Sequence, residues 1–310
     1  MHRELASSVR HLSEQATDIV PHDRPGIGAF LAGIDAGARH APLVFADYYA
    51  CVDALLADDH DAAEAAFGRL AAAQPVETAM RFAPLRDPKA CERSCRLVEL
   101  LLEDPGLDVG IHAPSPEVTA AFAARFHAGL ALLERACPEL AGEFRAIVRE
   151  VVPFVGDRSR TMQLDGGSHY RLWGALFLNA EFHATPHDIV EVLAHESAHS
   201  LLFGFCTHMP LVRNDDRQRF ASPLRQDTRP MDGIYHATFV SARMHFAMSQ
   251  LLDSGLLEPA TALQVRAARD ADLANFDAGH VTVREHADLT PLGRGLMHGA
   301  RDYMRAAGGG

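Results

Sequence analysis

The sequence predicts a mainly α-helical fold with a small β-sheet, an α+β class, and three observations lead to this prediction. Up to about Glu150 the chain is rich in Ala, Leu and Glu, and its apolar residues recur every three or four positions, as in amphipathic helices. Two short β-like runs, Val151–Val155 and Gly174–Leu178, then flank a glycine-rich polar stretch. Helical periodicity returns after the second run. We therefore expect a helical first half and a mixed second half.

Six helices are expected before the β-like runs, and proline-containing joints separate several of them. Their ranges are Glu4–Ile19, Pro42–Ala57, Asp61–Ala73, Lys89–Leu102, Pro116–Arg135 and Glu139–Glu150. We expect the two β-like runs to begin a small sheet. Four further helices are expected over Pro186–Phe203, Ile234–Leu252, Pro259–Asn275 and Pro291–Arg305.

These elements divide the chain into three parts. Residues 1–150 form the expected helical region, which we expect, from its position alone, to recognise a leader sequence or a partner. Residues 151–307 contain the expected metal-binding catalytic region. Residues 308–310 are three consecutive glycines, and we expect them to form a disordered tail because they have no side chain to pack.

The composition excludes several classes of partner. The chain has 29 Lys and Arg against 41 Asp and Glu, so its formal net charge of −12 opposes binding to nucleic acid. No run approaches the roughly 18 apolar residues of a membrane span, and the charged start lacks the apolar core of a signal peptide. The five cysteines are odd in number and scattered, as expected of reduced thiols. We therefore expect a cytoplasmic protein with neither nucleic acid nor membrane as partner; the oligomeric state stays open.

One motif predicts a metal site. The segment His195-Glu196-Ser197-Ala198-His199 is an H-E-x-x-H pattern, in which the two histidines lie one helical turn apart and can converge on one ion. The residues just before the motif predict the start of a helix, since Thr185 is a good N-cap and Pro186 suits the first helical position. Glu196 points along a neighbouring direction, as a base or an outer hydrogen-bond partner of the metal site. The alternative is a pair of core histidines without a metal.

The third ligand is not supplied by the familiar zinc-peptidase patterns. The extended form of the motif requires glycine at position 202 and histidine at position 205, where this chain has Leu202 and Phe205. Of the two glutamates that follow the motif, Glu258 lacks the Asn-Glu helix context of such enzymes. His236, near the start of an expected helix, is the better candidate. Other histidines, such as His245, are taken as ordinary core or surface residues.

A second segment resembles a known family. From Arg225 to His236 the chain reads Arg-Gln-Asp-Thr-Arg-Pro-Met-Asp-Gly-Ile-Tyr-His. This segment is similar to the second signature, roughly R-x-D-x-R-P-x-x-G-x-x-H, of the HExxH-type peptide-modifying proteins of ribosomal peptide natural-product clusters. The two motifs have the order and separation of that family, and the resemblance spans about Gly166 to Phe246.

The resemblance implies an activity other than proteolysis. Members of the family are understood as non-haem Fe(II)- and 2-oxoglutarate-dependent dioxygenases, which use O₂ to hydroxylate a β-carbon of a precursor peptide. Carried over to this chain, His195, His199 and His236 would bind iron. Imidazole suits Fe(II) as well as zinc. Because three histidines depart from the commoner pair of histidines with one carboxylate, Glu196 and Asp232 stay open as rival ligands or outer partners.

The cosubstrate 2-oxoglutarate has a distal carboxylate, which an arginine fork binds better than a lysine. Arg243 lies two helical turns after His236, and Arg229 and Arg225 lie in the loop before it. We favour Arg243 or Arg229 as the 2-oxoglutarate ligand, with Arg225 third. The alternative is that these arginines pair with neighbouring aspartates and order the loop.

Three functions are therefore compared. The first is a peptide β-hydroxylase that needs Fe(II), 2-oxoglutarate, O₂ and a precursor peptide, and the arginine-bearing loop favours it. The second is a zinc-dependent metallopeptidase with Glu196 as general base. The third is a non-catalytic peptide-binding module. We expect the peptide to lie beside the strand Gly174–Leu178, because extended peptides can add to a sheet edge; its sequence, and the residue that is modified, are not predicted.

Overall fold

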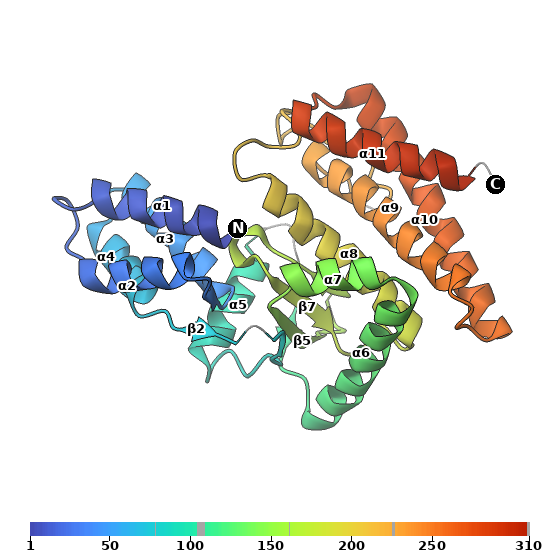
Figure 1. The fold of residues 1–310 in the computed structure, drawn as a ribbon, viewed down its shortest axis with the longest axis horizontal. Coiled ribbons are helices and arrows are strands. Elements are labelled where there is room, and N and C mark those ends of the chain that lie inside the picture. Colours follow the sequence, from blue (N-terminus) through green and yellow to red (C-terminus); the bar gives the residue numbers. More distant parts are fainter. Residues whose placement is uncertain (78, 104–108, 161, 225–226, 309–310) are drawn as a thin grey trace. The chain divides into compact units, whose positions relative to one another are not determined.

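The computed structural model describes residues 1–77, 79–103, 109–160, 162–224 and 227–308. The protein is mainly helical with a small mixed sheet, as the sequence predicts (Figure 1). It forms two compact units, residues 1–114 with 148–179, and residues 115–147 with 180–310. Each unit is thus built from two segments. This division differs from the expected boundary at residue 150, because two helices before that residue pack with the helices that follow the sheet.

The first unit contains α1 (His2–Gln15), α2 (Arg24–Asp35), α3 (Leu43–Leu56), α4 (His60–Ala71) and α5 (Glu92–Leu101). The first four helices share one core, in which Val9, Ile27 and Phe67 are buried. Strand β1 (Arg39–His40) lies between α2 and α3, and it pairs antiparallel with β2 (Pro75–Val76), which follows α4. Four of these five helices were predicted; α2 was not.

Helix α2 was missed because its sequence contains three glycines, which lower helix propensity. Two features overcome that cost. The side chain of Asp23 caps the helix by accepting a hydrogen bond from the backbone N–H of Gly26, and a proline stands in the first turn. Ile27, Phe30, Leu31 and Ile34 recur at helical spacing and are all buried. Tertiary burial therefore decides the conformation here.

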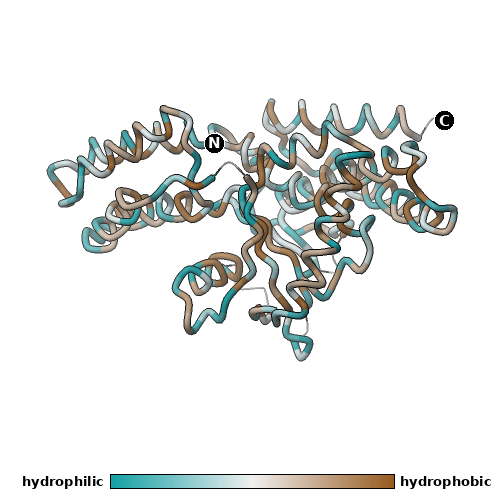
Figure 2. The backbone as a smooth tube through the Cα atoms, turned by 60° about the horizontal axis from the view of Figure 1, so that its bottom comes forward, coloured by the Kyte–Doolittle hydropathy of each residue, from teal (hydrophilic) through white to brown (hydrophobic). Residues whose placement is uncertain are grey.

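The sheet also belongs to the first unit. Its strands are β3 (Arg81–Phe82), β4 (Ile111–His112), β5 (Glu150–Gly156), β6 (Gly166–Gly167) and β7 (Ala175–Asn179), with a short 3₁₀ turn, η1 (Tyr170–Leu172), before β7. The order is β3-β5-β7-β6, and β4 pairs with β5 in addition. Strands β5 and β7 are parallel and almost wholly buried, and Figure 2 shows this pair as a continuous hydrophobic segment.

Strand β7 does not offer a free edge over its whole length. Its Phe177 and Leu178 pair with Gly167 and Gly166 of β6, and β5 pairs along the other side. The edge at which we expected a peptide to add is therefore already occupied at these two residues.

The second unit contains α6 (Pro116–Ala136), α7 (Pro138–Ile147), α8 (Pro186–Phe205), α9 (Met231–Asp253), α10 (Pro259–His286) and α11 (Pro291–Gly308). Helix α9 packs against α8, α10 and α11, and its buried residues include Ile234, Tyr235 and Val240. Gly308 ends α11, so this part of the expected tail is helical; residues 309 and 310 lie outside the described residues. No helix among the described residues combines the length and hydrophobicity needed to cross a lipid bilayer.

Two glycines allow helices of the second unit to approach closely. A Cβ atom at Gly129 of α6 would lie 2.4 Å from the Cβ atom of Ile189 in α8. A Cβ atom at Gly279 of α10 would lie 2.2 Å from the hydroxyl oxygen of Thr238 in α9. Gly279 is thus a contact residue inside α10, which continues past the predicted end at Asn275 to His286.

Candidate functional site

Helix α8 carries the H-E-x-x-H motif and begins as the sequence predicts. Thr185 accepts a hydrogen bond from the backbone N–H of Asp188 at 3.2 Å, and the Asp188 carboxylate accepts one from the backbone N–H of Thr185 at 2.9 Å. This capping box satisfies two N–H groups at the helix start. Pro186 occupies the first turn. The predicted helical context of the motif is confirmed.

The three predicted histidines lie together. The Nε2 atoms of His195 and His199 are 3.2 Å apart, and the Nδ1 atoms of His199 and His236 are 2.9 Å apart. The rings of His199 and His236 stack, with centroids separated by 5.2 Å and an interplanar angle of 16°. The motif helix and α9 therefore bring together residues that are 37 positions apart.

The ring nitrogens do not all face one point. His199 presents Nε2 to His195 and Nδ1 to His236, so His236 lies on the opposite ring nitrogen from His195. Among the described residues, no three His, Cys, Asp or Glu side chains are arranged as a ready metal site. The separation of His195 and His199 matches two imidazoles that share an ion at bond lengths of about 2.1 Å. His236 contacts His199 on the side of the ring that faces away from His195.

Burial keeps two of these imidazoles neutral. It lowers the pKa of His199 well below the ordinary value, and the nearby imidazoles of His195 and His236 lower it further. Burial also lowers the pKa of His236, against the opposing effect of Asp232. A neutral imidazole retains a lone pair, which can accept an N–H···N hydrogen bond or bind a metal ion. The donor set therefore fits a metal that accepts imidazole, and protons compete little for it.

Apolar and sulfur-containing groups surround the cluster. The ring of Phe203 lies 5.3 Å from the ring of His236, and the Met244 sulfur lies 3.3 Å from Nδ1 of His195. His236 is only 7% exposed. These neighbours limit the access of water on their side of the three imidazoles.

Glu196 is buried beside the first histidine, with 4% of its surface exposed. Its Oε1 atom lies 3.9 Å from Nε2 of His195, beyond hydrogen-bond distance. This position is compatible with either role predicted from the sequence, a base or an outer partner of the metal site. Asp232, the other carboxylate named for the site, lies 3.9 Å from Nε2 of His236 and is largely exposed.

Two of the three arginines predicted to bind 2-oxoglutarate, Arg243 and Arg229, have carboxylate partners. Arg243 of α9 forms an ion pair with Glu143 of α7, and its buried Nε atom has no hydrogen-bond partner among the described residues. Arg229 pairs with Asp227 at 3.3 Å and bridges to Phe220 through the backbone, so it orders the loop before α9. Arg225 lies outside the described residues.

One buried carboxyl group in this unit was not predicted. Asp272 of α10 is 2% exposed, and its Oδ2 atom has no hydrogen-bond partner among the described residues. Burial, together with the charge of Glu191, raises its pKa to about 8. Glu191 precedes His195 by one helical turn on α8. A single acidic residue inside a helical pattern gave no signal, because the burial comes from the packing of other helices.

The second unit thus holds a donor set of three clustered imidazoles and one adjacent buried carboxylate on α8 and α9. Such donors suit Fe(II) and zinc rather than calcium or magnesium, which prefer oxygen ligands. No protein-family model and no curated protein sequence matches the chain.

Proposed function

We propose that the protein is a non-haem, Fe(II)- and 2-oxoglutarate-dependent dioxygenase that hydroxylates a β-carbon of a residue in a ribosomally made precursor peptide. The observation that carries this proposal is the cluster of His195, His199 and His236, with N···N distances of 3.2 and 2.9 Å. In this cluster the histidine of the second sequence motif, His236, contacts His199 of the first motif, and this contact supports the proposal.

His195, His199 and His236 would hold the iron, which, when bound with 2-oxoglutarate and O₂, supplies the oxidising chemistry. The protein's part is to keep the imidazoles neutral. The lowered pKa values of His199 and His236 serve this purpose at neutral pH. Because His199 turns its two nitrogens to different neighbours, three-histidine binding requires one ring to turn.

Arg243 is our first candidate for the distal carboxylate of 2-oxoglutarate. It is on the same helix as His236, seven residues later, which corresponds to about 10 Å of helical rise. It already binds one carboxylate in this position, that of Glu143. Arg229 remains the second candidate and already binds a carboxylate, that of Asp227.

Two features support an intracellular peptide as substrate. All five cysteines lie in the described part of the chain as free thiols, in keeping with the reducing cytoplasm. The helical region before the sheet contains its own core, and we propose that it recognises the leader of the precursor peptide.

A zinc-dependent metallopeptidase is the second candidate. The observation in its favour is Glu196, a buried carboxylate with an oxygen 3.9 Å from Nε2 of His195. In such an enzyme Glu196 would take a proton from the attacking water. In the dioxygenase it would act from outside the set of ligands.

The two candidates are separated by incubating the protein and a mixed peptide library either with Fe(II), 2-oxoglutarate and O₂ or with zinc. The dioxygenase predicts succinate formation that needs iron and is lost in His195→Ala and His199→Ala. Glu196→Gln should retain part of it, since the carboxylate does not carry the reaction. Zinc-dependent cleavage of the library, abolished by Glu196→Gln and without succinate, would establish the peptidase. If the protein shows neither activity, both enzyme hypotheses are refuted and the peptide-binding module is the remaining one.

A further inference from the structure

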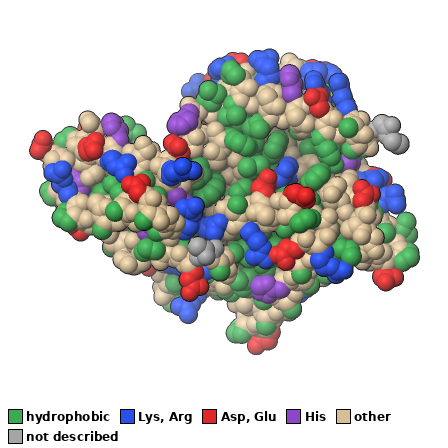
Figure 3. Space-filling view, in the orientation of Figure 1, with side chains coloured by type: hydrophobic (Ala, Val, Ile, Leu, Met, Phe, Trp, Pro, Cys, Tyr) green, Lys and Arg blue, Asp and Glu red, His purple; other side chains and the backbone are tan. Residues whose placement is uncertain are grey.

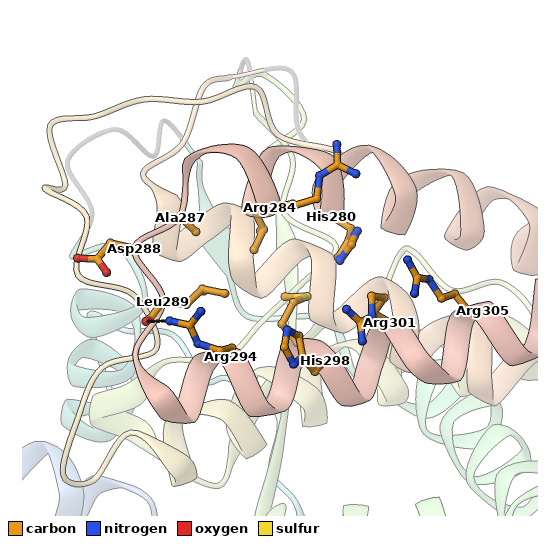
Figure 4. A pocket seen from close by; sticks show the side chains of 11 residues that line it. His280, Arg284, Ala287, Asp288, Leu289, Arg294, His298, Arg301 and Arg305 are labelled. Atoms are coloured by element: carbon orange, nitrogen blue, oxygen red, sulfur yellow. Dashed lines mark hydrogen bonds between the residues drawn. The ribbon is translucent and has the colours of Figure 1, made fainter.

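Helices α10 and α11 enclose a groove away from the histidine cluster (Figure 4). One cavity of about 310 Å³ and an adjoining one of about 510 Å³ make up this groove. The two cavities share His280, Arg284, Arg301 and Arg305, so they form one continuous depression. We call it the α10–α11 groove.

The groove is basic although the chain is acidic. Four arginines line the groove, Arg284, Arg294, Arg301 and Arg305, against two acidic residues, Asp288 in the first cavity and Asp277 in the second. On α11 the arginines at 294, 301 and 305, with His298, recur at helical spacing and form one stripe. Figure 3 shows basic side chains, coloured blue, along the upper edge of the molecule where α11 lies, and this helix has arginines but no lysine. The sign of the charge is thus reversed locally in a protein of net charge −12.

Three of the four arginines have weak local contacts in the described part of the chain. Arg284 pairs with the next residue, Glu285, and Arg301 pairs with the next residue, Asp302; three of these four side chains are more than half exposed. Arg294 donates to the backbone carbonyl of Leu289 at a long 3.4 Å. Exposed ion pairs of this kind contribute about 1 kcal/mol or less. An incoming anion can therefore replace these partners at little cost.

The pKa of His280 is lowered by burial and by the positive charges of the groove. Burial lowers the pKa of this imidazole, and the charges of Arg284, Arg301 and Arg305 lower it further, against a smaller opposing effect of Asp277. Its ring stacks on Phe276 with a centroid distance of 5.4 Å. At neutral pH the groove thus combines guanidinium groups with a neutral aromatic wall.

The floor of the groove is apolar. Val283 and Met297 are 1% and 2% exposed, and Leu289 lies half-buried beside them. A ligand that carried only phosphates would leave this floor without a partner. A peptide with alternating acidic and apolar side chains would cover both the floor and the arginines.

We propose that the α10–α11 groove binds an extended acidic peptide segment. Arg294 and Arg305 are separated by about 16 Å of helical rise, the length of about five extended residues. Arg301 and Arg305 are about 6 Å apart along the helix, close to the repeat of side chains on one face of an extended chain. Each guanidinium fork can take one carboxylate in a bidentate pair. This binding goes beyond the proposed function, because it needs no chemistry at the histidine cluster.

The test uses the full chain without added metal and a fluorescein-labelled heptapeptide that alternates glutamate with leucine. Fluorescence anisotropy should show saturable binding that weakens as salt is raised. The double variant R301E/R305E should lose at least about tenfold in affinity, and the milder R301Q/R305Q should lose less. Arg266→Glu, on α10 and exposed but outside the groove, is the matched control and should change the affinity less than about twofold.

Three outcomes would overturn the proposal. Equal binding of a peptide with glutamine in place of glutamate would show that the carboxylates are not recognised. Unchanged affinity in both double variants, with unchanged melting temperature, would place binding elsewhere. Tighter binding of a single-stranded oligonucleotide, lost in the same variants, would assign the groove to nucleic acid. None of these results depends on turnover, so the proposal can fail while the proposed dioxygenase stands, and the reverse.

Discussion

Arg243 of α9 and Glu143 of α7 form an ion pair within the second compact unit, between helices 100 residues apart in sequence. The side chains are 22% and 30% exposed, so the pair is half-buried. A second carboxylate that binds Arg243 would therefore share the guanidinium, and its positive charge, with Glu143. This competition makes the proposed role of Arg243 testable from both sides of the pair.

We expect Glu143→Gln to tighten 2-oxoglutarate binding, because it removes the competing charge. Arg243→Gln should weaken binding by about tenfold or more, the value of a charge-assisted hydrogen bond. Isothermal titration with 2-oxoglutarate measures both affinities when Mn(II) replaces Fe(II) under air. If neither variant alters the affinity while Arg229→Gln does, the ligand is Arg229.

His236 is either a metal ligand or a positioning residue for His199, since it contacts the Nδ1 atom of His199 at 2.9 Å. As a ligand, its replacement by alanine should weaken Co(II) binding about as much as His199→Ala does. His245→Ala, on the same helix and bonded instead to the hydroxyl of Tyr303, is the control and should leave the affinity unchanged. An intermediate loss of about 10-fold, rescued by His236→Asn, would show that His236 only orients His199.

The buried Asp272 predicts a pH-dependent stability. Its folded-state pKa of about 8 exceeds the ordinary value of 3.8, so the folded protein holds the proton more tightly than the unfolded chain. The stability from this group is present at low pH and is lost as the pH rises toward and through 8. Asp272→Asn should therefore raise the free energy of unfolding by at least about 1 kcal/mol more at pH 9 than at pH 5. Urea titrations at the two pH values measure this difference, and an equal effect at both would contradict it.

His2 predicts the opposite dependence in the first unit. Burial and the charge of Arg39 lower its pKa to about 4, and its Nε2 accepts a hydrogen bond from the backbone N–H of His40. Because the unfolded chain takes up the proton first, stability should fall as the pH falls from about 6.5 to about 4, by up to about 3 kcal/mol. His2→Gln keeps an acceptor and should flatten this part of the profile. A variant profile as steep as that of the wild type would show that other groups cause the loss.

Gly129 predicts a steric effect on the helix that carries the metal motif. A Cβ atom there would meet Ile189 of α8 at 2.4 Å, so Gly129→Ala should destabilise the protein by about 1–3 kcal/mol despite the better helix propensity of alanine. Gly142→Ala is the matched control, since a Cβ atom at Gly142 of α7 meets nothing within 4 Å. It should stabilise the protein by about 0.5–1 kcal/mol. Thermal unfolding of both variants checks the contrast, and equal shifts would rule out the close helix contact.

The sequence was most informative where local signals and burial agree. The start of α8 was predicted because Thr185, Pro186 and Asp188 form a local capping pattern. Helix α2 was missed because its glycines oppose the helix locally and only the core of the first unit stabilises it. The end of α10 was missed for a related reason, since Gly279 lies within the helix at a close contact with Thr238.

For the site, the sequence identified the residues but not their contacts. The two motifs predicted that His195, His199 and His236 hold one metal ion; the structure shows that the three lie near one another, and their metal binding stays a prediction. The direction of each ring depends on how α8 packs against α9, which no local pattern encodes. The pairing of Arg243 with Glu143 likewise depends on the packing of α7 beside α9.

The central claim is that the three histidines hold Fe(II) together with 2-oxoglutarate. It is tested most directly by adding Fe(II) and then 2-oxoglutarate to the metal-free protein under anaerobic conditions while recording the visible absorption spectrum. We expect a charge-transfer band that needs both additions and is absent from His195→Ala, His199→Ala and His236→Ala. Tight binding of zinc, with no band after Fe(II) and 2-oxoglutarate, would contradict it.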